Sequence, residues 1–391
     1  MLLLVAVWAA PAQAGAGPTT LLVTVSRTGG PANGGSYLDA ITPDGQFVLF
    51  DSRASNLVRG DTNGVQDVFV RNLTTGRTAR VSVGPHRRQA NRPCFGNAIS
   101  PDGRFVVFTS AASDLVRHPD TNGVSDVFLR DRATGRTFRV SVSTSGRQFD
   151  QPSTGGVVSA DGGIVAFTRQ INVDTWYVDI RDRAARTTHA ISKKQDTVPD
   201  AISDDGRFLT FSVEDHHGTA FFIDVRNRLS GRQWQVPLPP AGGGSVWGVV
   251  ATPNARYVAF SGLDQNGSGQ DAYLWRRGAS TSTTIRNEPN GSIGVHGISA
   301  DGRYVAAMDG SALVAGDTNV TGDLYRIDMT GGAAVRASVS DGGVQLPHGA
   351  WDIDGAVAMT GDGTKIAFTT RDPAVATDTN TLNDVYLRTG L

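Results

Sequence analysis

A ten-residue pattern that recurs seven times along the chain constrains the fold more than any other feature. Each copy has a serine or threonine, a short turn that usually contains Asp-Gly, and a run of apolar residues, as in ISPDGRFVVF at 99–108. The pattern returns every 44 to 61 residues, with its serine or threonine at Thr42, Ser100, Ser159, Ser203, Thr252, Ser299 and Thr360. A repeat of this period indicates an array of equivalent structural units.

Each unit is predicted to hold four short strands. The first ends at the serine or threonine, and the glycine of the turn supplies the positive φ that such turns need. The next run, such as RFVVF, is apolar on both faces and suits a buried strand. DVFLRD and RTFRVSVS then supply a third and a fourth strand, and no helical periodicity of useful length is present. Four-stranded units at this period predict a β-propeller.

The two ends of the chain predict how the ring closes. The C-terminal NDVYLRTGL matches a third strand and has no fourth strand behind it. The N-terminal TTLLVTVSRTGGPAN matches the fourth-strand segment RTARVSVGPHRRQAN. We therefore expect an all-β, seven-bladed propeller of four-stranded antiparallel blades in which the N-terminal strand completes the last blade. Such closure removes exposed sheet edges.

The repeat AISPDGRFVVFTSAASDLVRHPDTNGVSDVFLRD resembles the TolB-like, WD-type propeller repeat of secreted bacterial proteins. The likeness covers nearly the whole chain and is closest in blades 1, 2, 6 and 7. The TolB propeller has six blades, so a count of seven departs from it. The resemblance implies a propeller fold and a tendency to bind partners, but it implies no particular reaction.

The first seventeen residues predict export. MLLLVAVWAAPAQAGAG contains an apolar run that is too short to span a bilayer and ends in Ala-Gln-Ala, a cleavage pattern of secretory signal peptides. We expect residues 1–14 to be a signal peptide and residues 15–391 to form one propeller domain, secreted and monomeric. The formal net charge is −1, and without a clustered basic stretch we expect no nucleic-acid partner.

Two columns in the third strand are predicted to be structural. An aromatic residue, Phe69 in blade 1, recurs two positions after the strand begins, and we expect it in all seven blades as core between blades. At the strand start six of seven blades carry aspartate. A group repeated this widely is expected to hydrogen-bond the backbone.

An Asp-Thr-Asn segment before the third strand occurs only in blades 1, 2, 6 and 7, which are neighbours in a closed ring. With the strand-start aspartate it places oxygen ligands at positions 1, 3 and 7, a spacing that suits calcium. Asp and Asn also form turns through their own side chains, so a plain Asx-turn remains the alternative. The candidate calcium ligands are Asp61, Asn63, Asp67, Asp120, Asn122, Asp126, Asp317, Asn319, Asp323, Asp378, Asn380 and Asp384.

A second candidate site lies at the mouth of the central channel. The first-strand position three residues before the serine or threonine is polar in four blades, where it holds Asp39, Asn97, Asp200 and His296. Solvated channel lining and an enzymatic metal site are the two interpretations. The loop with Glu214, Asp215, His216 and His217, and His348, are further positions that suit metal ligands.

The sequence favours a secreted, non-enzymatic propeller that binds a protein or glycan partner through its loop face, with calcium as the one candidate cofactor. No G-x-S-x-G, H-E-x-x-H or P-loop motif is present. The alternative is a metal-dependent propeller enzyme, polysaccharide lyase or hydrolase-like, with its site at the channel mouth. Oligogalacturonate lyases are similar in having a seven-bladed fold of TolB type and a His-rich metal site.

Overall fold

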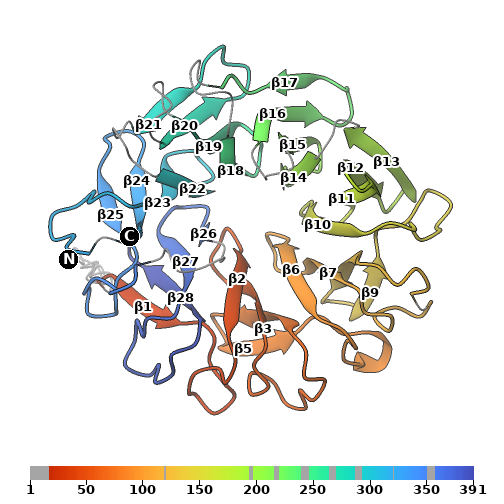
Figure 1. Ribbon diagram of the computed structural model, residues 1–391, viewed down its shortest axis with the longest axis horizontal. Coiled ribbons are helices and arrows are strands. Elements are labelled where there is room, and N and C mark those ends of the chain that lie inside the picture. The colour runs from red at the N-terminus through yellow and green to blue at the C-terminus, as the bar shows by residue number, and fades with distance from the viewer. Residues whose placement is uncertain are drawn as a thin grey trace, which may run out of the picture.

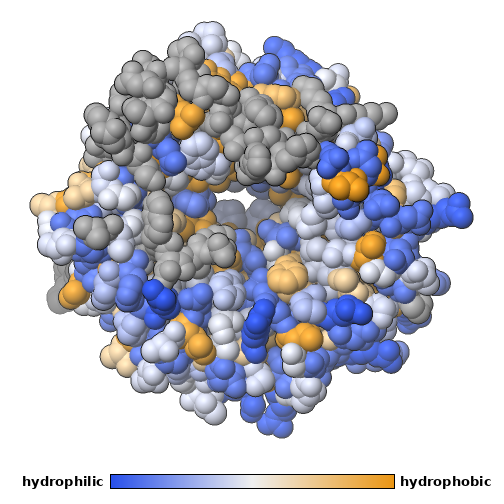
Figure 2. Space-filling model, in the orientation of Figure 1, coloured by the Kyte–Doolittle hydropathy of each residue, from blue (hydrophilic) through white to orange (hydrophobic). Residues whose placement is uncertain are grey.

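A computed structural model describes residues 17–118, 120–192, 197–214, 220–238, 246–263, 270–286, 293–319, 321–349 and 357–391. The predicted signal peptide and residues 215–217 lie outside these ranges. Seven four-stranded antiparallel blades stand in a ring around a central opening (Figures 1 and 2). The predicted fold class is confirmed. The described residues contain no helix long and apolar enough to span a membrane.

Blades 1 to 4 follow one another along the chain, each built from the inside of the ring outward (Figure 1). Blade 1 is formed by β2 (Ser36–Ile41), β3 (Phe47–Ser52), β4 (Asp67–Asn72) and β5 (Arg77–Arg80). Blade 2 is formed by β6 (Cys94–Ile99), β7 (Phe105–Ser110), β8 (Asp126–Asp131) and β9 (Arg136–Arg139), and a short 3₁₀ turn, η1 (Pro85–Arg87), precedes it. Blade 3 is formed by β10 (Ser153–Val158), β11 (Ile164–Asn172), β12 (Thr175–Asp182) and β13 (Thr187–Ser192). Blade 4 is formed by β14 (Thr197–Ile202), β15 (Phe208–Glu214), β16 (Ala220–Asn227) and β17 (Gln233–Gln235).

Blades 5 to 7 complete the ring. Blade 5 is formed by β18 (Val246–Ala251), β19 (Tyr257–Leu263), β20 (Gln270–Arg276) and β21 (Thr283–Arg286). Blade 6 is formed by β22 (Ile293–Ile298), β23 (Tyr304–Asp309), β24 (Asp323–Asp328) and β25 (Ala334–Arg336). Blade 7 is formed by β26 (Ala358–Met359), β27 (Lys365–Thr370), β28 (Asp384–Thr389) and β1 (Thr19–Leu22).

The outermost strand of blade 7 comes from the other end of the chain. β1 pairs with β28 in an antiparallel register that joins Thr19 to Thr389 and Leu22 to Tyr386. Val23 then donates its N–H to the carbonyl of Val385 at 2.8 Å. This pairing confirms the predicted closure and covers the edge that β28 would otherwise present to solvent.

The repeated turn between the first two strands is held by its own side chains. In blade 2 the Ser100 hydroxyl donates to Asp102 Oδ1 at 2.6 Å and accepts the N–H of Phe105 at 2.8 Å. Asp102 Oδ1 also accepts the N–H of Arg104 at 2.9 Å, and Gly103 has a φ of 71°. The serine or threonine and the aspartate of the repeat therefore fix the turn, and glycine supplies the left-handed residue.

The hydrophobic core lies between adjacent blades. Val68 and Val70 of blade 1, for example, pack with Val106 and Phe108 of blade 2 in one buried cluster. Each blade buries both of its faces against its neighbours. The second strands of the repeat, which are apolar on both faces, therefore lie in the core between blades.

The aromatic column of the third strand is present in five blades, not in all seven as the sequence predicts. It holds Phe69, Phe128, Tyr273, Tyr325 and Tyr386, all buried. In blades 3 and 4 the register instead pairs Phe167 with Asp179 and Phe211 with Asp224. The prediction was wrong in blade 3 because it counted two residues from the start of the third strand. There β11 and β12 form a longer hairpin, so Trp176 lies nearer the loop than the aromatic residues of the other blades.

The innermost strands share an irregularity that faces the centre of the ring. In blade 1 the pairing of β2 with β3 shifts between Leu38 and Ala40, which makes Asp39 a bulged residue. Equivalent shifts occur in β6, β10, β14, β18 and β22. Bulges interrupt a ladder and redirect a side chain, and they are common next to functional sites.

Candidate functional site

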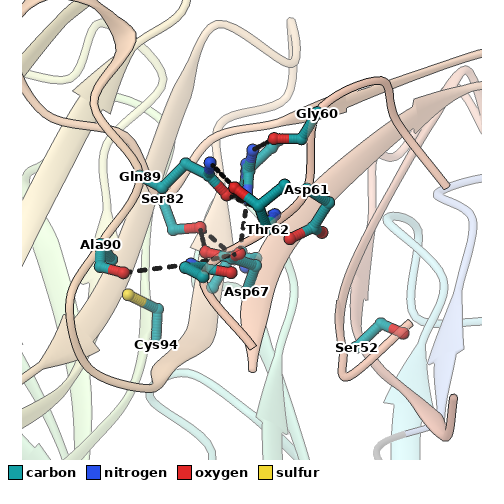
Figure 3. A network of polar contacts seen from close by, with 12 residues as sticks. Ser52, Gly60, Asp61, Thr62, Asp67, Ser82, Gln89, Ala90 and Cys94 are labelled. Atoms are coloured by element: carbon teal, nitrogen blue, oxygen red, sulfur yellow. Dashed lines mark hydrogen bonds and ion pairs between the residues drawn. The ribbon is translucent and has the colours of Figure 1, made fainter. Parts of the chain in front are cut away.

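A network of polar contacts surrounds Asp61 and Asp67 in the Asp-Thr-Asn loop of blade 1 (Figure 3). Nη1 of Arg80 lies 3.0 Å from Oδ1 of Asp61 and 2.8 Å from Oδ2 of Asp67. The Ser82 hydroxyl donates to Oδ1 of Asp67 at 2.5 Å. The sequence predicts that the strand-start aspartate bonds the backbone, but in blade 1 Asp67 is held by side chains of its own blade. Burial raises the pKa of Asp61 and the guanidinium opposes that rise.

The asparagine of each motif fastens its loop to the segment that follows the fourth strand of the same blade. Asn63 Nδ2 donates to the carbonyl of Ala90 at 3.0 Å, and Asn122 Nδ2 to that of Phe149 at 2.8 Å. Asn319 and Asn380 make the same bond, to the carbonyls of Leu346 and Ala32, each at 3.1 Å. The four neighbouring loops therefore share one fixed geometry.

Blades 2 and 6 repeat the arginine of blade 1. Arg139 lies 3.2 Å from Asp120 and 3.0 Å from Asp126. Arg336 lies 3.5 Å from Asp317 and 3.4 Å from Asp323. In these three blades an arginine guanidinium already contacts both carboxylates that a calcium ion would need. The arginine therefore takes the place of calcium as the cation of these loops.

Blade 7 lacks this arginine. The register places Arg80 opposite Phe69 in blade 1 but Leu22 opposite Tyr386 in blade 7. Asp384 is held by the hydroxyl of Thr24 and by Nδ2 of Asn380, and Asp378 accepts the hydroxyl of Tyr386. Burial raises the pKa of Asp384 to about 7, and the charge of Asp378 adds to the rise. Among the four motifs, the calcium prediction therefore fits blade 7 best.

The four residues predicted at the channel mouth all occupy the bulged position of an innermost strand. Asn97 accepts the hydroxyl of Thr109 at 2.8 Å, and Asp200 accepts that of Ser212 at 3.1 Å. His296 is half-buried, and burial lowers the pKa of its imidazole. These three residues come from blades 2, 4 and 6. The structure therefore places them around the channel and not in one cluster (Figure 1).

Asp39 has a second carboxylate beside it. Asp51, near the end of β3, is 6% exposed and accepts Nε2 of Gln66 at 2.6 Å and the N–H of Gly96. A Cβ added to Gly96 would lie 1.9 Å from Oδ2 of Asp39. Both carboxylates of blade 1 thus lie against the same glycine of blade 2. A side chain at this glycine would displace Asp39.

The environment of this pair favours the protonated state. Oδ2 of Asp39 is buried and has no hydrogen-bond partner among the described residues. Burial, and then the charge of Asp51, raises the pKa of Asp39 well above its usual value. Burial raises the pKa of Asp51 to about 7 despite the opposing bonds from Gln66 and Gly96 and the charge of Arg53. Two neighbouring buried carboxyl groups cannot easily both be ionised, so the pair retains a proton near neutral pH.

Sequence reasoning missed Asp51, although the repeat contains a signal for it. The same second-strand position in the other blades holds Thr109, Thr168, Ser212, Ser261, Met308 and Thr369. A hydroxyl here has a structural use, since Ser261 accepts the N–H of Val295 and Thr369 that of Leu38. The carboxylate of Asp51 is therefore a departure that the fold does not require.

Two aromatic residues occupy equivalent positions in the innermost strands of blades 1 and 2. Tyr37 pairs directly with Asp51 in the sheet, and Phe95 precedes Gly96 at the matching position of blade 2. Phe95 is 47% exposed, and Tyr37 is half-buried. An exposed aromatic ring next to carboxyl groups can hold the apolar face of a sugar while the carboxyl groups meet its hydroxyls.

The described residues do not form a metal cage. No three His, Cys, Asp or Glu side chains within them converge closely enough to hold a metal ion. His348 lies outside the innermost strands, and its Nδ1 lies 2.6 Å from Oδ1 of Asp372. Within the described residues, which exclude His216 and His217, no His-rich metal site like that of the oligogalacturonate lyases is present around His296.

Known proteins share the fold of this chain but not its sequence. No family model and no curated protein matches it, so the likeness to TolB-type repeats remains a resemblance. An oligogalacturonate lyase in complex with manganese superposes with a TM-score of 0.62 at 15% identity, over 96% of this chain and 97% of the lyase. The oligogalacturonate lyase of Vibrio parahaemolyticus gives a TM-score of 0.59 at 14% identity, with the same coverage. The propeller domain of the Trilobed protease from Pyrococcus furiosus gives 0.54 at 13%, over 92% of this chain and 95% of the domain. These likenesses establish a seven-bladed β-propeller and nothing finer.

Proposed function

We propose that the protein is an extracytoplasmic propeller enzyme that cleaves a glycosidic bond of a polar glycan, with Asp39 as its proton donor. The observation that carries the proposal is the carboxylate pair of Asp39 and Asp51 on the innermost part of blade 1. Paired carboxyl groups, one of which keeps its proton, are the usual machinery of glycoside cleavage. The full-length fold likeness to two oligogalacturonate lyases supports a glycan as the substrate class, as far as a shared fold can.

Each residue of the pair has a different role in this proposal. Asp39 is the more exposed of the two and meets the substrate. Its proton passes to the bridging oxygen as the C–O bond breaks, which removes the need to expel an alkoxide, while a water molecule adds to the anomeric carbon and releases a proton to solvent. Asp51 is a positioning residue, because its charge holds the proton on Asp39 while Gln66 and Gly96 hold Asp51 in place. Phe95 and Tyr37 provide a surface for the sugar ring.

Non-enzymatic binding of a protein or glycan partner is the second candidate function. It is favoured by the four Asp-Thr-Asn loops, whose asparagine bonds give one face of the ring a fixed polar surface. A preformed surface binds with little cost in conformational entropy. The metal-dependent form of the enzyme hypothesis receives no support from the described residues, so no step is assigned to a metal.

Release of reducing ends from a panel of neutral and acidic polysaccharides tests the proposal. Asp39→Asn is expected to lower kcat by at least about 100-fold, the typical contribution of a general acid. Asp51→Thr introduces the residue that three other blades carry at this position. It removes a charge that raises the pKa of Asp39. The alkaline limb of its pH profile should therefore move to lower pH.

Asp44→Asn is the matched control. Asp44 lies in the turn after β2, where it accepts the hydroxyl of Thr42, and blade 5 carries Asn254 at the same position. The variant should keep full activity. If the parent protein releases no reducing ends from any polysaccharide while it still binds one, the enzyme proposal fails and the binding scaffold stands.

A further inference from the structure

A groove of about 1040 Å³ opens at the outer rim of the ring where blade 7 meets blade 1. Its walls come from the segment after β1, the start of the Asp-Thr-Asn loop of blade 1, and β5 with the loop that follows it (Figure 1). Among the described residues, the groove is lined by six arginines and by no aspartate or glutamate. The arginines are Arg27, Arg59, Arg71, Arg77, Arg80 and Arg87. Such a concentration of one charge is unexpected in a chain with 36 basic and 37 acidic residues.

Five of these guanidinium groups have no carboxylate partner. Arg80 is ion-paired to Asp61 and Asp67, whereas the other five form no ion pair within the described part of the chain. Arg27, Arg59, Arg77 and Arg87 are exposed. Unpaired like charges repel one another, so the folded protein gains nothing from holding them together. Their assembly indicates an anionic ligand.

Arg71, which also lines the groove, makes fewer hydrogen bonds than its counterparts in two other blades. Arg71 donates to the hydroxyl of Thr78 at 3.0 Å, and burial lowers the pKa of its guanidinium. At the same position Arg130 and Arg388 also reach a carbonyl of the preceding blade, those of Val83 and Ser340. No such second bond is made by Arg71 within the described residues. Arg71 is half-buried, so the N–H groups that it does not use within the protein can donate to an acceptor in the groove.

The backbone that carries Arg87 is strained. His86 and Arg87 have φ values of 55° and 61°, in the left-handed region that residues with a Cβ seldom adopt. They form η1, in the loop that leads from blade 1 to blade 2. Two consecutive non-glycine residues in this conformation are energetically unfavourable, and such strain is concentrated at binding sites.

We infer that this arginine groove binds an acidic polysaccharide, through the carboxylate or sulfate groups of the chain. The planar guanidinium fork matches these anions with two parallel hydrogen bonds. Ser26, Thr78 and Gln89 in the lining can meet sugar hydroxyls. Single-stranded nucleic acid is less suited, because its binding sites use stacked aromatic side chains and the lining contains none. The inference concerns a site on the rim, away from the channel, and does not rest on the proposed function.

Binding of the full-length protein to heparin, a sulfated chain, and to alginate, a carboxylated chain, tests the inference, with neutral dextran and a single-stranded oligonucleotide for comparison. We expect binding to at least one acidic glycan that weakens as salt rises, since each charge contact releases counterions. The double variant Arg59→Gln/Arg77→Gln should bind about tenfold more weakly, with a smaller salt dependence. Both arginines are exposed and unpaired, so the variant should melt like the parent.

The matched control is Arg117→Gln/Arg136→Gln, which removes the exposed arginines at the same two positions of blade 2. It should bind like the parent. An equal loss in both double variants would overturn the inference, because the attraction would then come from overall charge. Tighter binding of the oligonucleotide than of either acidic glycan at equal salt, or no acidic glycan bound even at low salt, would also overturn it.

Discussion

Blades 1 and 7 carry the same Asp-Thr-Asn motif, yet they handle its buried charge differently. In blade 1 the outermost strand belongs to the same repeat and supplies Arg80, which neutralises Asp61 and Asp67. In blade 7 the outermost strand comes from the N-terminus and presents Leu22 instead. Two carboxylates are then buried among hydroxyl and amide groups alone, and the pKa of Asp384 rises to about 7. The strand that closes the ring reproduces the backbone of a blade but not its charge balance.

The largest effect should follow from removing the cation of blade 1. Arg80→Met leaves Asp61 and Asp67 buried without compensation, which typically costs about 3–5 kcal/mol of unfolding free energy. Urea unfolding at pH 8, where both carboxylates would be ionised in the unfolded chain, measures the loss. The converse change, Leu22→Arg, adds the missing cation to blade 7 and should raise stability at pH 8. Equal stability of the parent and Arg80→Met would mean that the guanidinium does not balance these charges.

A smaller effect concerns the pH dependence of stability. Burial raises the pKa of Asp384 to about 7, so the folded protein binds a proton that the unfolded chain has lost between about pH 4 and 7. The contribution of Asp384 to stability therefore falls as pH rises through this window. The parent should lose about 2 kcal/mol of unfolding free energy across this window, and Asp384→Asn should not. One pKa unit corresponds to about 1.4 kcal/mol, and solvent screening lowers the total. Melting curves from pH 4.5 to 8 measure it. A parent and variant with parallel profiles would contradict the assignment.

The smallest effect concerns calcium. Because blade 7 lacks a built-in cation, a calcium response should depend on Asp378 and not on Asp61. A single weak site adds only about 0.4 kcal/mol when free calcium equals its dissociation constant. Melting temperatures with calcium and with chelator should differ for the parent and for Asp61→Ala, but not for Asp378→Ala. If they agree for the parent as well, the Asx-turn interpretation holds for all four loops.

The sequence by itself determined the fold, because the features that define it are local and repeated. The turn around Ser100, Asp102 and Gly103 is built within six residues. Its seven copies in the sequence therefore predict seven blades. The C-terminus has no fourth strand and the N-terminus resembles one, which was enough to predict that β1 would complete blade 7. The four polar residues of the first strand were also identified by position, since a bulge recurs at the same place in each repeat.

Only the tertiary structure decided which side chains meet. Asp51 departs from the residues at the same position of the other blades, but its partnership with Asp39 arises only where both lie against Gly96 of the next blade. The six arginines of the rim groove are spread over 61 residues of sequence and come together because the ring closes between blades 7 and 1. In blades 3 and 4 the position expected to hold an aromatic residue holds Asp179 and Asp224, because the length of the hairpin sets the register. Contacts across blades depend on register and ring closure, and neither is visible in a single repeat.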